Sequence, residues 1–226
     1  MKLKYVIAAG LCGAALVMFV RCRELSVPKA REQMVAYLET RYPQDNFRFE
    51  HDESKGFKPE HKFDHEIAAS CDRFLDASIH VKRWISNGKK YYSDNYMAYY
   101  LQSDAEACMH DIAESVFGEC KVYMSSPLLI YTPDSFPTDA NAVYFLQSKL
   151  QCGFAVYLPP SHSKENAAEN LNKFKEKLTG NQFFGIGGGV RIIKEQESYD
   201  EISSFDGPAG GIVDNPVCDF IGGFEV

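Results

Sequence analysis

The longest uncharged stretch of the chain lies at its beginning. Residues 5–20 contain no charged side chain, and Lys4 and Arg21 close the run on either side. A bilayer core about 30 Å thick needs about 20 apolar residues of helix, with a lower limit near 17. Leu3 can lengthen the run, and the flanking basic side chains can reach the headgroups. The pattern predicts a signal-anchor or transmembrane segment over residues 1–24, which contacts the lipid bilayer through its apolar run.

A cleaved secretory signal is the alternative, because it has the same basic start and an apolar run of about 7–15 residues. Cleavage requires small residues at the end of that run, where large and basic side chains stand instead. Attachment of a bacterial lipid would need a small residue before the acceptor cysteine, but Leu11 precedes Cys12 and Arg21 precedes Cys22. We therefore expect an uncleaved, single-pass anchor.

The flanking charges leave the sidedness of this anchor open. Counting Lys and Arg over short flanks would put the C-terminal side in the cytoplasm. Long domains cross the membrane largely regardless of such charges, and a short basic start before an apolar run is typical of export signals. We expect a cell-membrane protein whose domain is extracytoplasmic, with a cytoplasmic domain as the alternative. The basic residues after the run are Arg21, Arg23, Lys29 and Arg31.

Residues 25–126 alternate between helical and strand periods of apolar side chains. Pro43 disfavours helical backbone at the residue before it, so a helix with Met34 and Leu38 on its apolar face ends at Tyr42. The other predicted elements are strands at 47–50 and 79–85, a turn at Asn87–Gly88, a helix from Asp104 to Gly118 and a strand at 121–126, with a loop at 51–62.

Residues 127–226 are closer to an α/β pattern, in which strands alternate with helices. Residues 154–158 are uninterruptedly apolar, as in a strand that is covered on both faces. The other predicted elements are a strand at 128–131, helices beginning at 138 or 139 and at 163, a glycine-interrupted strand at 183–194 and irregular strands at the end. The fold class predicted for the whole chain is α+β, with lobes at 25–126 and 127–226 of mixed sheet and packed helices.

The charge and cysteine content of the folded part disfavour several classes of partner and site. Residues 25–226 carry 20 basic and 30 acidic side chains, a net charge of −10, which disfavours nucleic acid and anionic lipid. Five of the seven cysteines lie outside the membrane segment, at spacings that form no C-x-x-C pair. Neither a zinc ribbon nor a dense disulfide framework is indicated. We expect buried thiols, and a single bridge between Cys108 and Cys120 stays open.

The densest group of potential metal ligands is His61-Lys62-Phe63-Asp64-His65-Glu66. On a helix His61 and His65 would share one face, and Asp64 or Glu66 could complete a metal site. The zincin pattern H-E-x-x-H is absent, because no second histidine follows at the required spacing. A charged, solvated loop or helix start explains the same residues, so no metal ligand is assigned.

Two further segments have both a functional and a structural explanation. Gly185–Gly189 is followed by Val190-Arg191, where a phosphate-binding loop needs Lys and Ser or Thr, so the glycines indicate a bulge or bend. Five tyrosines between Tyr91 and Tyr100 suit a partner or glycan surface, but loop and edge packing over the core between a strand and a helix is the favoured explanation. No catalytic or cofactor-binding residue is predicted.

Several short segments follow the apolar run in this order: Tyr37–Tyr42, Phe47, Asp94-Asn95-Tyr96, Ile112–Glu119 and Lys121-Val122-Tyr123. Together they resemble a group of small uncharacterised, membrane-anchored and lipoprotein-like envelope proteins of Gram-positive bacteria. The resemblance covers about residues 1–126, and it departs at the missing lipid-acceptor cysteine and at Pro43, where a glycine is common. It implies a bacterial envelope setting and no catalytic residue.

These patterns favour a single-pass, membrane-anchored protein with an extracytoplasmic, non-catalytic binding domain, no cofactor and an envelope protein as partner. The alternative is a metal-dependent hydrolase that uses His61 and His65 with a neighbouring carboxylate.

Overall fold

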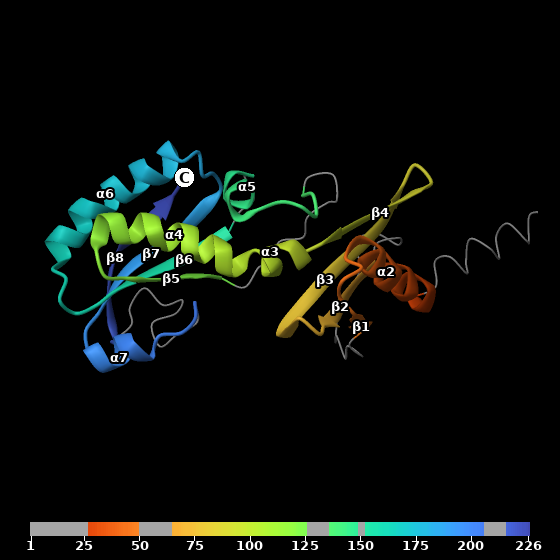
Figure 1. Cartoon of the computed structure of the whole chain (residues 1–226), viewed down its shortest axis with the longest axis horizontal. Coiled ribbons are helices and arrows are strands. Elements are labelled where there is room, and N and C mark those ends of the chain that lie inside the picture. Colours follow the sequence, from red (N-terminus) through yellow and green to blue (C-terminus); the bar gives the residue numbers. More distant parts are fainter. Residues whose placement is uncertain (1–26, 50–64, 126–135, 149–151, 206–215) are drawn as a thin grey trace, which may run out of the picture. The chain divides into compact units, whose positions relative to one another are not determined.

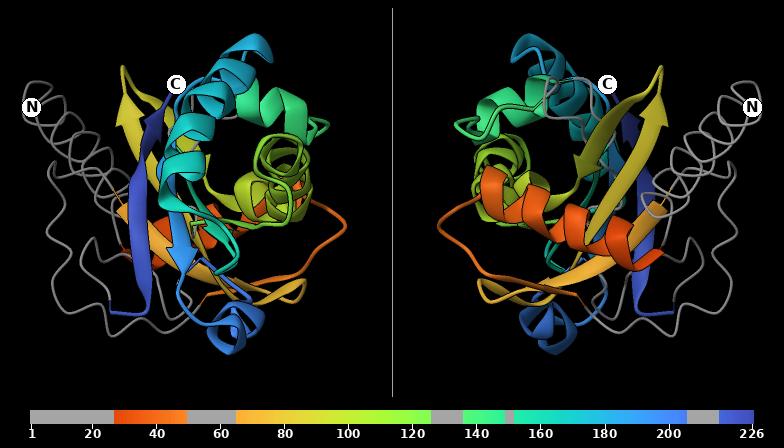
Figure 2. Two further views of the ribbon diagram at one scale, coloured as in Figure 1. Left: turned by 90° about the vertical axis from the view of Figure 1, so that its left-hand side faces the viewer. Right: turned by 90° about the vertical axis from the view of Figure 1, so that its right-hand side faces the viewer.

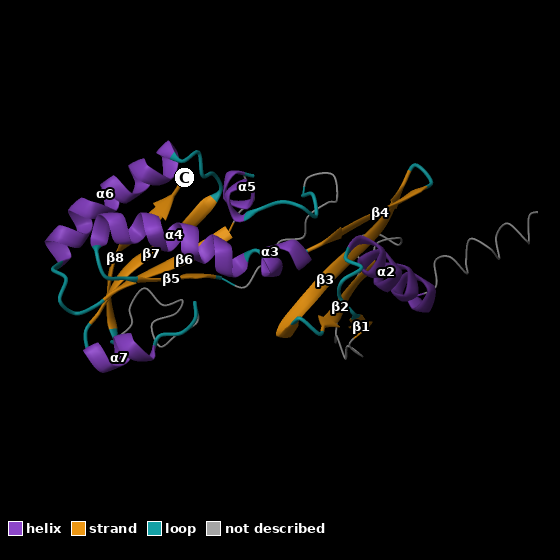
Figure 3. Cartoon of the chain, viewed as in Figure 1, coloured by secondary structure: helices purple, strands orange, loops and turns teal. Residues whose placement is uncertain are grey.

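The computed structural model describes residues 27–49, 65–125, 136–148, 152–205 and 216–226, and these form two compact units (Figure 1). The first unit contains the described residues up to Asp94, and the second contains those from Asn95 onward. Each unit has one four-stranded sheet with packed helices, so the α+β class is confirmed (Figure 3). The division lies earlier in the chain than the predicted one at residues 126 and 127.

The first unit is a helix followed by an antiparallel sheet with strand order β1-β2-β3-β4. Its elements are α2 (Val27–Arg41), β1 (Phe47–Phe49), β2 (His65–Cys71), β3 (Phe74–Ser86) and β4 (Lys89–Asp94). The helix and the strands β1 and β3 follow the predicted periods. Strand β4 was not predicted, because a tyrosine-rich loop was expected after the turn at Asn87–Gly88. Strand β2 covers His65, for which a charged loop or a helix was the expectation.

Helix α2 packs on one face of this sheet and contacts β1, β2 and β3. It buries Met34 and Leu38 against the alternating residues Ile79 and Val81 of β3, and all four side chains are inaccessible to solvent. The four-residue spacing on the helix and the two-residue spacing on the strand both match the sequence pattern. The predicted turn between β3 and β4 is present, with positive φ at both Asn87 (50°) and Gly88 (74°).

The second unit has the strand order β5-β6-β7-β8, with β6 and β7 parallel and the outer pairs antiparallel. Parallel neighbours need a crossover connection, which α6 provides between β6 and β7. The strands are β5 (Lys121–Met124), β6 (Cys152–Leu158), β7 (Ile186–Ile193) and β8 (Cys218–Glu225). The helices are α3 (Tyr96–Tyr100), α4 (Gln102–Phe117), α5 (Ala142–Gln147), α6 (Lys164–Gly180) and α7 (Gln196–Glu201).

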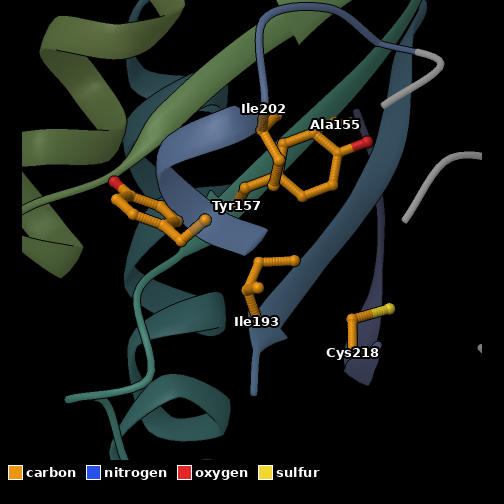
Figure 4. Close-up of a cluster of buried hydrophobic side chains, with 6 residues drawn as sticks. Ala155, Tyr157, Ile193, Ile202 and Cys218 are labelled. Carbon is orange, nitrogen blue, oxygen red and sulfur yellow. The ribbon is translucent and has the colours of Figure 1, made fainter. Parts of the chain in front are cut away.

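Helices α4 and α6 lie beside each other on the same side of the second sheet (Figure 2). Their packing includes the Phe117 and Phe174 rings, whose centroids are 5.5 Å apart, and Phe174 meets Phe224 of β8 edge-on at 5.2 Å. A second cluster joins Ala155 and Tyr157 to the end of α7 (Figure 4). Residues 154–158 are therefore buried on both faces, as their apolar run predicts.

Two glycines of β7 leave room for aromatic rings that pack closely on this strand. A Cβ atom at Gly188 would clash with the Phe154 carbonyl oxygen and would lie 2.6 Å from Phe224 Cζ. A Cβ atom at Gly189 would lie 2.8 Å from the Phe220 ring. The predicted glycine-interrupted strand is confirmed, and close approach by neighbouring groups explains the residue choice.

We expect Gly188→Ala to destabilise the protein by about 3 kcal/mol or more, because the new methyl group meets backbone that cannot turn away. Urea unfolding followed by circular dichroism measures the change. Gly180→Ala at the end of α6 is the matched control, because no atom lies within 4 Å of its added Cβ. A Gly188→Ala midpoint equal to that of the control would contradict this explanation.

Candidate functional site

A buried carboxylate connects α2 to the end of β4. Asp94 is 3 % exposed, and its two oxygens accept hydrogen bonds from different tyrosines. The Tyr37 hydroxyl donates to Oδ2 at 2.6 Å, and the Tyr42 hydroxyl donates to Oδ1 at 2.9 Å. Tyr37 lies near the C-terminal end of α2, and Tyr42 directly follows the last residue of that helix. The carboxylate thereby fixes the position of the helix along β4.

Arg41 extends this network toward the surface. Its Nε donates to the Tyr42 hydroxyl at 2.9 Å and lies 3.9 Å from Asp94 Oδ2. Burial raises the pKa of the Tyr37 and Tyr42 hydroxyls well above their ordinary value of 10.0, and the Asp94 carboxylate raises the pKa of both further. Both phenols therefore remain hydrogen-bond donors at physiological pH, and neither is a nucleophile or a general base.

A groove runs beside this network between α2 and β4. Its volume is about 630 Å³, and we call it the α2–β4 groove. The Tyr37 and Tyr92 rings stack in its wall, with centroids 4.7 Å apart and planes 9° apart. Its lining combines aromatic, amide and cationic groups. The aromatic, amide and cationic residues are Gln33, Tyr37, Arg41, Lys90 and Tyr92, and Ala36 and Thr40 complete the lining.

The β3–β4 hairpin carries a second aromatic pair on the sheet face opposite the groove. Trp84 of β3 and Tyr91 of β4 are directly paired in the sheet register, and their rings stack at 5.6 Å. Tyr91 is 40 % exposed. Strand β4 is the edge of the first sheet among the described residues, and it therefore carries aromatic side chains on both faces.

The predicted tyrosine-rich surface is divided between the two units. Tyr91 and Tyr92 belong to β4, whereas Tyr96, Tyr99 and Tyr100 belong to α3. In the second group Tyr96 is buried and Tyr100 is exposed. Their rings are stacked, with centroids 6.0 Å apart. The expected loop is therefore a strand followed by a short helix, and the partner of Tyr92 is Tyr37.

The sequence did not predict the residues that line the α2–β4 groove together with Tyr92. Tyr37 and Arg41 were assigned only to a helix, and Lys90 only to the region after a turn. Their spacing of four on α2 places Tyr37 and Arg41 on one helix face, and this was the available signal. Their pairing with Asp94 spans more than fifty residues and has no local pattern.

The structure brings no metal site together among the residues it describes. His61 and Asp64 lie outside the described residues, and His65 is half-buried at the start of β2. Glu66 is directed to a different histidine, with Oε1 3.3 Å from His80 Nδ1. The helical geometry on which the metal hypothesis rested is replaced by a strand at His65.

The five cysteines within the described residues are all free. Cys71, Cys120 and Cys218 are buried, and Cys108 and Cys152 are half-buried. Burial raises the pKa of the Cys120 and Cys152 thiols to about 12. They are therefore protonated at neutral pH and are poor nucleophiles. Cys108 and Cys120 are not bridged.

The predicted membrane segment, residues 1–24, lies outside the described residues, including its apolar run over 5–20. Within the described ranges no helix has the length and apolar character that a membrane crossing requires.

The chain was compared with protein families, curated proteins and solved structures. No protein-family model matches the chain, and no curated protein matches it. The chain has a likeness to the crystal structure, at 2.55 Å, of a DUF5037 family protein from Ruminococcus gnavus, with 11 % identity over 74 % of this chain and 76 % of that chain. The TM-score is 0.34, which does not establish a shared fold.

The tyrosine network makes stability sensitive to alkaline pH. Because the folded pKa of Tyr37 and Tyr42 is raised, their contribution is complete below pH 10 and is lost as the pH rises beyond it. We expect the free energy of unfolding to fall above pH 10 by up to about 1.4 kcal/mol per pH unit for each tyrosine. Urea midpoints measured between pH 8 and pH 11 test this.

The variant with Tyr37→Phe and Tyr42→Phe should have a flatter stability profile above pH 10. It should also be less stable than the parent at pH 8, because Asp94 loses both donors. Tyr91→Phe, at an exposed site of the same unit, is the control. Parallel pH profiles for the double variant and the control would rule out the network as the cause.

Proposed function

We propose that the protein is a single-pass, membrane-anchored protein of the bacterial envelope, whose folded part lies outside the cytoplasm and binds an envelope protein without catalysis. The anchor rests on the uncharged run of residues 5–20, and the outward orientation rests on its export-like start. The binding role rests on the α2–β4 groove.

The groove has the composition of a recognition surface. Tyrosine offers a large apolar ring and a polar hydroxyl at low conformational cost, and arginine and tyrosine are common in the centres of protein interfaces. Here two stacked tyrosine rings lie beside Arg41 and Lys90. This local positive charge stands in a folded part whose net charge is −10. An acidic segment of a partner protein complements it.

The wall of the groove is rigid, which favours binding over catalysis. Tyr37 is held by its hydrogen bond to Asp94 and by its stack on Tyr92, so little side-chain entropy is lost when a partner docks. The acidic or basic groups that catalysis would need are engaged in structural contacts here, since Asp94 accepts from two tyrosines and Arg41 donates to one.

The experiment uses the complete chain in living bacterial cells and places a photo-crosslinking amino acid at Lys90, in the groove, or at Leu75. Leu75 is 87 % exposed in the same unit, and Leu75 and Ile85, which pairs with Lys90, are ten residues apart on β3, roughly 33 Å. We expect a discrete protein adduct from Lys90 and none from Leu75. Equal adducts from both positions, or none from Lys90, would refute the groove as a binding surface.

The same chain tests sidedness through Leu75→Cys. We expect a charged, membrane-impermeant maleimide to label this cysteine in intact cells. Labelling that appears only after lysis would place the domain in the cytoplasm and would refute the orientation. The parent chain, without the new exposed thiol, supplies the background.

A further inference from the structure

Arg83 is a charged side chain enclosed in the core of the first unit. It lies on β3 two residues after Val81, on the sheet face that α2 covers, and its exposed fraction is 0 %. In the sheet register it stands between His65 of β2 and Tyr92 of β4. Arginine stays charged at any physiological pH, so the core of this unit contains a permanent positive charge.

The guanidinium of Arg83 lacks the acceptors that a buried charge requires. Its Nε, Nη1 and Nη2 atoms are all inaccessible to solvent, and none has a hydrogen-bond partner among the described residues. Buried charges in proteins are normally paired and hydrogen-bonded, because an unpaired one loses its hydration without compensation. Arg83 is therefore an exception that calls for an external acceptor.

The nearest carboxylate in the sheet register is already engaged. Asp94 pairs with Val81, so it is a diagonal neighbour of Arg83 on the same face. Both of its oxygens accept hydrogen bonds from tyrosines, and Arg41 is its cationic neighbour. The protein thus supplies one buried anion with several partners and leaves the adjacent buried cation without one.

Gln33 is a second buried polar group in this region. Its Oε1 is inaccessible and has no hydrogen-bond donor among the described residues. Gln33 lies one helical turn before Tyr37, whose ring stacks on Tyr92, the register neighbour of Arg83. Gln33 and Tyr92 both line the α2–β4 groove, which is open to solvent.

We propose that Arg83 and Gln33 form an anion-binding site at the inner end of the α2–β4 groove, and that it takes a carboxylate or a phosphoryl group. The planar guanidinium has five N–H donors in a fork that matches two oxygens of either group. The Gln33 amide supplies a donor or an acceptor for the remaining oxygen or hydroxyl of the ligand. Arg41 and Lys90 at the rim add positive charge along the entry.

This inference rests on the proposed function, because it names the chemical group that the groove recognises. An acidic side chain of a protein partner and a small free anion present the same oxygens to Arg83. Small anions are therefore sufficient probes for the site itself.

The direct test is NMR of the complete chain, labelled with 15N-arginine and held in detergent micelles, during titration with sodium acetate or sodium phosphate. Sodium chloride at matched ionic strength is the reference. We expect a saturable shift of the Arg83 Nε–Hε signal with one of the two anions, and the preferred anion separates a carboxylate from a phosphoryl ligand. An Arg83 signal that follows the chloride reference with both anions would overturn the proposal.

Variants supply a second, independent measurement through thermal unfolding. We expect the preferred anion to raise the unfolding temperature of the parent and of Arg48→Met, which alters an exposed arginine on β1. Arg83→Met should not respond to the anion, and Arg83→Lys should bind it at least roughly tenfold more weakly, because lysine lacks the fork. Arg83→Lys keeps the charge and also identifies the Arg83 signal by its loss.

The anion-free stability of Arg83→Met separates a ligand site from a structural contact. An unpaired buried charge predicts that methionine at this position leaves the unfolding temperature equal or higher without anion. A large fall, together with an unchanged anion response in Arg83→Lys, would show that Arg83 is held by Gln33 or by another group of the chain and would overturn the proposal. An anion response without a Lys90 crosslink would leave this site standing and refute the protein-binding groove.

Discussion

The contact between α2 and Asp94 is the constraint on which the first unit depends. Its sheet is antiparallel and is covered on one face by this helix, so the core exists only if the helix keeps its position. Apolar packing of Met34 and Leu38 is non-directional and does not fix that position along the strands. The hydrogen bonds from Tyr37 and Tyr42 to Asp94 do, because each fixes a distance and a direction. Because Tyr37 also lines the α2–β4 groove, these hydrogen bonds fix the wall of the groove as well.

In the second unit, apolar packing holds the helices in position on the sheet. Its central strand β6 is covered on one face by helices and on the other by the Tyr157 and Tyr199 cluster. Gly188 and Gly189 of β7 allow the Phe224 and Phe220 rings of β8 to pack closely on that strand. One cation takes part at the edge, where Lys121 Nζ donates to the carbonyl oxygens of Tyr199, Asp200 and Ile202 at 2.7–3.0 Å. Those carbonyls end α7, which is the favourable place for a positive charge.

Features that depend on near neighbours could be predicted from the sequence. The Asn87–Gly88 turn, the apolar strand at 154–158 and the helix that Ser163 caps are all set by short-range periods and turn chemistry. The helix expected from residue 138 or 139 begins instead at Ala142, after the Asn141 cap, and leaves Val143 exposed. Strands β2 and β4 and helix α3 were missed because their polar and aromatic residues have no clear period. Pairing with β3 decides both strands. The candidate site was largely missed for the same reason, since Tyr37, Lys90 and Asp94 come together only through the tertiary fold.

The two buried charges of the first unit have different roles. Asp94 holds α2 in place, whereas Arg83 is available to bind a ligand. Asp94 and Arg83 are diagonal neighbours on one sheet face, and both are shielded from water. If burial of charge served only to hold α2 in place, the simplest arrangement would pair the two directly, as buried ions of opposite sign generally are. The carboxylate is instead saturated by tyrosines, which leaves the guanidinium with its full hydrogen-bonding capacity. A charge that the fold encloses and does not satisfy lowers stability, so its retention calls for an explanation, and a ligand that completes it is one. The position of Arg83 beside the aromatic wall of the groove gives that ligand a route.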